Sequence, residues 1–193
     1  MTENTCTITI DGKTVELPVV EGTTGDRAID ISRLRELTGV TTLDSSLANT
    51  ASCRSAISWI DGENGRLLYR GIPIETLAEN KVSFVETAML LITGRLPTPA
   101  ERNDFSELLA RNSALHRNMD LHFNAFPPNS HPMAIMSAMI NAMSTHDRPK
   151  ITDEDSAIRN SAKLMSRVRT IAAASYKASV GEPAIYPRMD LKY

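Results

Sequence analysis

Basic residues recur at every fourth position in the segment Asp155–Val180, at Arg159, Lys163 and Arg167. In a helix this spacing places the three side chains on one face. Arg111, in another predicted helix, is a further candidate partner. Convergent guanidinium and ammonium groups bind phosphate or carboxylate oxygens, so the pattern is compatible with an anion site. The residues alone favour the alternative, a solvated helix face whose charges pair with glutamates.

The four histidines are His116, His122, His131 and His146. None pairs with a second ligand at the spacing of a helical metal site, so no metal site is predicted. His131 begins a predicted helix, where a neutral imidazole could donate to a substrate oxygen, but a packed structural histidine is favoured. Cys53 beside Arg54 is interpreted as a buried strand cysteine rather than an activated thiol. No nucleophile–base arrangement follows from spacing, and we predict no catalytic residue.

The composition excludes several classes of protein. With 21 basic and 23 acidic residues the net charge is −2, which predicts no nucleic-acid partner. Two cysteines are too few for a disulfide framework and suit a reducing compartment. The first residues, MTENTCTITI, lack a basic and then apolar leader, and no apolar run of 18 residues occurs, so no membrane partner is expected. We therefore expect a cytoplasmic protein.

The first third of the chain has the pattern of β hairpins. Residues 5–17 alternate around Asp11-Gly12, a dipeptide that tolerates the positive φ of a tight turn. This register places Cys6 and Ile8 on one face with Leu17 and Val15. A second hairpin is predicted at residues 52–70, and a short helix, closed by a glycine, over residues 32–38.

From Pro73 onward the apolar period becomes helical. Ser83 with Glu86, and Thr98 with Glu101, form two capping boxes, which predict two helix starts. Further helices are expected over residues 114–126, then from a cap at Ser130 to about residue 144, and over residues 155–180.

The helix after Ser130 has two distinctive sides. One predicted stripe is apolar and consists of Met133, Met136, Ile140 and Met143. Another consists of the small residues Ala134, Ser137, Ala138 and Ala142. Small side chains allow a second helix to approach closely. A buried core helix is the favoured interpretation, and a subunit-interface helix is the alternative.

Four segments together resemble the citrate synthases. They are NTASCRSAISWIDGENGRLLYRGIPIETLAEN (49–80), TGRLPT (93–98), SHPMAIMSAM (130–139) and SVGEPAIYPRMDLKY (179–193). The β-rich start is similar to that of the hexameric type of Gram-negative bacteria. The resemblance implies a mainly α fold: a small β-rich N-terminal domain over residues 1–48, then the first part of the helical large domain over residues 49–193.

Members of this family condense acetyl-CoA with oxaloacetate to give citrate and CoA at the entry of the tricarboxylic acid cycle. They are acyltransferases that use histidine and aspartate as acid–base groups. Their histidine motifs HGG and GHR and their NVD-like aspartate motif do not occur here. We therefore expect an inactive fragment of such an enzyme. The alternatives are a stand-alone, non-catalytic oligomerisation paralogue and the equivalent part of a 2-methylcitrate synthase.

The resemblance also implies a regulatory site and a homo-oligomeric assembly. Gram-negative members bind NADH as an allosteric inhibitor, and Arg111, Lys163 and Arg167 fall at matching positions. The resemblance implies a homo-oligomer, a dimer or hexamer of the full-length protein. It implies no cofactor besides the substrates and this possible inhibitor.

Overall fold

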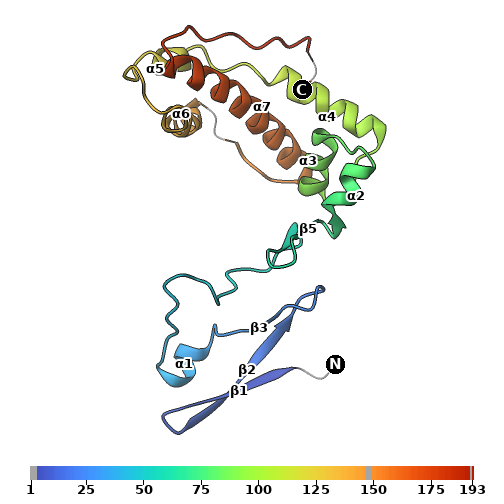
Figure 1. The fold of residues 1–193 in the computed structure, drawn as a ribbon, viewed down its shortest axis with the longest axis vertical. Helices are drawn as coiled ribbons and strands as arrows, with labels where there is room; N and C mark the ends of the chain where they lie inside the picture. The colour runs from blue at the N-terminus through green and yellow to red at the C-terminus, as the bar shows by residue number, and fades with distance from the viewer. Residues whose placement is uncertain (1–3, 147–148, 192) are drawn as a thin grey trace. The chain divides into compact units, whose positions relative to one another are not determined.

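A computed structural model describes residues 4–146, 149–191 and 193. It is drawn in Figure 1. The chain divides into two compact units, Met1–Ser55 and Ala56–Tyr193. Each unit has its own sheet and its own buried residues, and the two are described separately.

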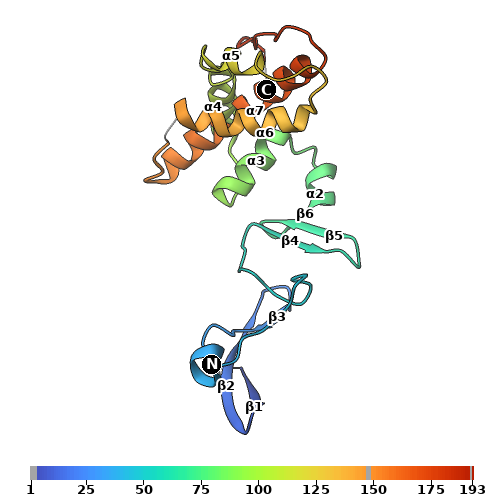
Figure 2. The same ribbon diagram turned by 90° about the vertical axis from the view of Figure 1, so that its left-hand side faces the viewer.

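The first unit contains an antiparallel sheet in the order β1-β2-β3 (Figure 2). Its strands are β1 (Thr5–Ile10), β2 (Lys13–Glu21) and β3 (Arg27–Ile29). Cys6 pairs with Leu17 and Ile8 with Val15, which confirms the predicted register. Asp11 and Gly12 form the turn with φ values of 49° and 77°, a conformation that this dipeptide tolerates.

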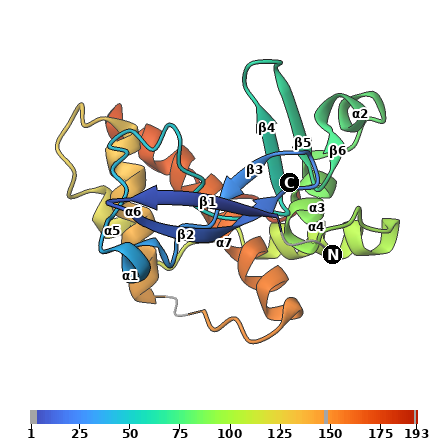
Figure 3. The ribbon, with the colours of Figure 1, turned by 90° about the horizontal axis from the view of Figure 1, so that it is seen from below.

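The described core of the first unit is small. Leu17 on β2 and Leu34 on α1 (Leu34–Thr38) are its buried apolar residues, and α1 lies beside β2 (Figure 3). The predicted helix is confirmed, and Gly39 ends it with φ 79°. Our interpretation of Cys53 was wrong: its side chain is exposed and lies outside any strand, because the second hairpin begins only at Ser58.

The second unit begins with a smaller antiparallel sheet in the order β4-β5-β6. Its strands are β4 (Ser58–Asp61), β5 (Arg66–Tyr69) and β6 (Ile72–Pro73). The predicted hairpin is therefore confirmed, in a shorter form. Just after β5, the Arg70 guanidinium donates a 2.7 Å hydrogen bond to the carbonyl oxygen of Leu91 near the end of α3. This hydrogen bond joins the end of β5 to α3.

The next helices are α2 (Ile74–Glu79), α3 (Phe84–Thr93) and α4 (Pro99–Arg111). Both predicted capping boxes are present. Ser83 Oγ accepts from the backbone N–H of Glu86, and Thr98 Oγ1 from that of Glu101, each at 3.3 Å. In both boxes the glutamate accepts in return from the backbone N–H of the cap residue, so two free helix donors are satisfied.

The last helices are α5 (Met119–Phe123), α6 (Pro132–His146) and α7 (Glu154–Ser179). The predicted helix over residues 114–126 was too long. Residues 114–118 are not helical, and just before them the Thr170 hydroxyl donates to the carbonyl oxygen of Ser113. The predicted cap of α6 was also wrong: Ser130 donates to the carbonyl oxygen of Pro127, and His131 Nδ1 accepts from the backbone N–H of Met133 at 3.2 Å.

Helix α7 joins two hydrophobic clusters. Its N-terminal half packs on α3 and α4, where Ala162 meets Phe105 and Leu109. Its C-terminal half packs on α5 and α6, where Ile171 and Ala174 are buried. Figure 1 shows both groups of helices along α7. Helix α7 therefore packs against both groups of helices in the second unit.

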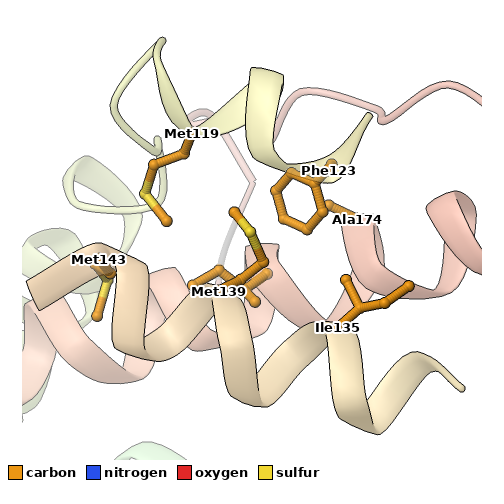
Figure 4. Packing of buried hydrophobic residues seen from close by; sticks show 7 residues of the cluster. Met119, Phe123, Ile135, Met139, Met143 and Ala174 are labelled. Carbon is orange, nitrogen blue, oxygen red and sulfur yellow. The ribbon is translucent and has the colours of Figure 1, made fainter. Parts of the chain in front are cut away.

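The cluster at α5, α6 and α7 confirms three members of the predicted stripe of α6, since Met143 is buried and Met136 and Ile140 pack against the cluster, and it corrects the fourth. Figure 4 shows Met119 and Phe123 of α5 reaching toward Met139 of α6. The buried residues of α6 are Ile135, Met139 and Met143. Met133, which we had placed in the apolar stripe, is 61% exposed, because it lies about 200° around the helix from Ile135.

Candidate anion-binding face

The C-terminal end of α4 is held on α7 by two side-chain hydrogen bonds. Ser166 Oγ donates to the carbonyl oxygen of Leu109 at 2.5 Å, and Thr170 Oγ1 to that of Ser113 at 2.7 Å. The last carbonyls of a helix have no partner within the helix, and these hydroxyls satisfy the end of α4. The contact therefore fixes where α4 ends along α7.

Lys163 and Arg167 lie on the same side of α7 as these two hydroxyls. Residues 163, 166, 167 and 170 fall within about 100° of one another around a helix. Both basic side chains are half-buried. Burial lowers the pKa of the Arg167 guanidinium, because desolvation disfavours its charged form. Arginine remains protonated in proteins, so this face carries the positively charged groups of Lys163 and Arg167.

Arg111 lies on a different side of α4. It is about 200° around the helix from Leu109, whose side chain faces α7. Its guanidinium pairs with the Glu107 carboxylate four residues earlier, and its side chain is 72% exposed. Arg159 is exposed near the start of α7. The structure therefore brings Lys163 and Arg167 onto one face and pairs Arg111 with Glu107.

The histidines have structural contacts. His131 caps α6, and the His122 ring lies 3.1 Å from the carbonyl oxygen of Asn118. His116 and His146 stack with their ring centroids 4.5 Å apart, a contact that no sequence pattern indicated. Within residues 4–146, 149–191 and 193, no three histidine, cysteine or acidic side chains are grouped to hold a metal ion.

Two tyrosines attach the segment after α7 to the helices. Tyr186 donates a 2.5 Å hydrogen bond to Asp120 on α5. This bond raises the pKa of the Tyr186 phenol, because the neutral phenol is the donor that the carboxylate binds. The Tyr193 ring stacks on Phe84 of α3 with centroids 5.8 Å apart, and the Arg169 guanidinium lies 4.3 Å from the Tyr193 centroid.

Comparison with known proteins identifies the class to which this architecture belongs. Residues 46–193 match the family model described as citrate synthase, C-terminal domain. The chain belongs to the citrate synthase family. In the part of the chain that is described, no helix has the length and hydropathy needed to cross a membrane.

Individual relatives agree with this assignment. The chain is 38% identical over 188 residues to citrate synthase 1 of Mycobacterium tuberculosis, covering 96% of this chain and 43% of that relative. The citrate synthase structure from Thermotoga maritima is 33% identical, with a TM-score of 0.64, covering 78% of this chain and 39% of that one.

A third comparison concerns the fold alone. A ternary complex of citrate synthase from Thermoplasma acidophilum with carboxymethyl coenzyme A and oxaloacetate matches with a TM-score of 0.73 at 21% identity. It covers 80% of this chain and 40% of that one. The chain therefore spans about two-fifths of the length of the relatives that it matches.

Proposed function

We propose that the protein containing these residues is a citrate synthase that condenses acetyl-CoA with oxaloacetate and releases citrate and CoA. The observation that carries this proposal is the family match over residues 46–193, together with 38% identity to a curated citrate synthase over 96% of the chain. A cytoplasmic location belongs to the same proposal.

Within that enzyme, we propose that residues 1–193 supply scaffold and no catalytic residue. The family's HGG, GHR and NVD-like motifs are absent from the sequence, and the described histidines make capping, backbone and stacking contacts. The acid–base groups that enolise the acetyl group and act on the oxaloacetate carbonyl would come from other residues of the protein. Residues 1–48 would form a β-rich N-terminal domain and residues 49–193 the first part of the large domain.

A CoA-release assay with acetyl-CoA and oxaloacetate tests both statements. We expect turnover from the complete product of the reading frame that contains this sequence, and none from the purified 193-residue chain. Turnover by the 193-residue chain would overturn the scaffold proposal. A folded complete product without turnover would overturn the enzyme proposal and favour a non-catalytic paralogue. A preference for propionyl-CoA would instead identify a 2-methylcitrate synthase.

We further propose that NADH binds the face formed by Lys163 and Arg167, with Arg111 as a third contact. Two half-buried cations on one face fit the phosphates of a dinucleotide. Arg111 would have to leave Glu107 in order to join them. Calorimetric titration of the complete protein with NADH tests this site. Binding that the double substitution Lys163→Gln and Arg167→Gln abolishes is expected, and unchanged binding would contradict the site.

The exposed side of α6 supports a homo-oligomer, dimer or hexamer. Ala134, Ser137 and Ala138 are exposed on α6, opposite its buried stripe. Small residues permit close helix–helix packing, so a second copy of the same helix fits this side.

A further inference from the structure

A cavity of about 590 Å³ lies beside the C-terminal end of α7. It is open to solvent and is bordered by α5 and by the segment over residues 181–186, which turns back past α5 after the helix ends (Figure 1). Its walls include the rings of Phe123, Phe126 and Tyr186, together with Pro128 and Pro183. A volume of this size falls within the range of small-molecule sites.

The charges at this cavity have one sign. Among the described residues that line it, the charged side chains are the carboxylates of Asp120 and Glu182, and none is a lysine, arginine or histidine. Ala174, Ala178 and Gly181 also line it, so it lies at the end of α7 where the helix dipole is negative. The lining therefore favours a positively charged ligand over an anion.

The two carboxylates differ in their contacts. Glu182 pairs with the Lys177 ammonium group, which offsets its charge. Asp120 accepts a 2.5 Å hydrogen bond from the Tyr186 hydroxyl, and a carboxylate has further lone pairs available. Asp120 therefore combines a full negative charge with remaining acceptor capacity, next to the Tyr186 ring.

We propose that this cavity binds a small organic cation, an ammonium group that carries an aromatic or alkyl substituent. The ammonium group would lie against the Asp120 carboxylate and the aromatic rings, which attract cations through their π faces. The substituent would fill the apolar part of the cavity between Phe126 and the prolines. This site is separate from the Lys163–Arg167 face and does not depend on the proposed enzyme activity.

The charge of Arg117 opposes this ligand. Arg117 lies three residues before Asp120, whose backbone N–H donates to the Arg117 carbonyl oxygen at 3.2 Å, although Arg117 does not line the cavity. Removing its charge should strengthen binding of a cation, whereas removing the charge of Asp120 should weaken it. The two substitutions therefore have opposite expected effects, which a general loss of structure would not produce.

Calorimetric or NMR titration of the 193-residue chain with three probes tests the proposal. We expect benzyltrimethylammonium to bind about tenfold more tightly than benzyl alcohol, because only the cation gains from the carboxylate and the rings. Phenylacetate should show no binding. Equal affinities for the cation and the neutral alcohol would overturn the proposal, as would the absence of any cation binding.

Variants assign the binding to this cavity. Asp120→Asn should weaken binding of benzyltrimethylammonium about tenfold, and Arg117→Gln should strengthen it severalfold. Glu75→Gln on α2 removes the same charge outside the cavity and should leave the affinity unchanged. Unchanged affinity in both Asp120→Asn and Arg117→Gln would overturn the assignment. If Asp120→Asn fails to fold, the direction of the change in Arg117→Gln decides alone.

Discussion

Ser166 Oγ donates a hydrogen bond of 2.5 Å to the carbonyl oxygen of Leu109, and both residues are fully buried. The two residues are 57 positions apart in the chain. The bond joins the middle of α7 to the end of α4, where the helix has carbonyls without helical partners. It therefore sets the position of α4 on the helix that supports the second unit.

Ser166→Ala should destabilise the second unit by about 1–3 kcal/mol, because it leaves the buried Leu109 carbonyl without its hydroxyl donor. The free energy of unfolding in urea measures the change. Ser137→Ala is the matched control, since Ser137 lies exposed on α6 and loses only a hydroxyl from a helix surface. The control should be neutral or slightly stabilising. Equal effects of the two substitutions would contradict the role given to Ser166.

Met139→Ala should be among the more costly single substitutions in the second unit. Met139 is 1% exposed and contacts the cluster shared by α5, α6 and α7, so truncation removes apolar contacts and leaves a cavity worth about 2–5 kcal/mol. Met133→Ala, on the exposed side of the same helix, should change the free energy of unfolding by less than about 0.5 kcal/mol. A larger loss of stability in Met133→Ala than in Met139→Ala would instead place Met133 on the buried side of α6, as the sequence alone predicted.

Features that depend on neighbouring residues were predictable from the sequence. The boxes at Ser83 and Thr98 and the glycine stop of α1 need only residues within a few positions, and each is present. The hairpin at Asp11-Gly12 likewise depends on a local turn and on alternation.

Features that depend on distant partners were not predictable. Helix α5 begins at Met119 rather than near residue 114, and the hydrogen bond from Thr170 to Ser113 just before it joins residues 57 positions apart. One member of the predicted stripe of α6 was misplaced, because Met133 and Met139 are chemically alike and packing against α5 and α7 selects between them. The pairing of Arg111 with Glu107 on the exposed surface of α4 is a contact that the sequence analysis did not predict.

The box at the start of α4 predicts a pH-dependent contribution to stability. The Arg95 guanidinium, followed by the Thr98 backbone N–H and hydroxyl, lowers the pKa of the Glu101 carboxyl from 4.5 to about 2. A carboxyl whose pKa is lower in the folded state stabilises that state above its unfolded pKa. The contribution is therefore complete above pH 4.5 and is lost as the pH falls from 4.5 toward 2.

Glu101→Gln should lower the melting temperature near pH 7, and the difference from the wild type should shrink between pH 4.5 and 2. Thermal melts followed by circular dichroism at several pH values measure this trend. In Arg95→Gln, a carboxyl NMR titration should show the pKa of Glu101 moving up toward 4.5, because the guanidinium that contributes most to lowering this pKa is removed. A melting-temperature difference that stays constant down to pH 2 would contradict the assignment.

The exposed small-residue side of α6 predicts a charge-sensitive oligomer. Ala138 is exposed beside Ala134 and Ser137, and close packing of a second copy would bury it. Ala138→Glu would place a carboxylate in that contact, where like charges from two copies meet at the symmetry axis and lose their hydration. Analytical ultracentrifugation of the complete protein should then show smaller assemblies than the wild type. Asn103→Glu adds the same charge on the exposed surface of α4 and should leave the assembly intact. If both variants assemble like the wild type, this side of α6 is not the contact between copies.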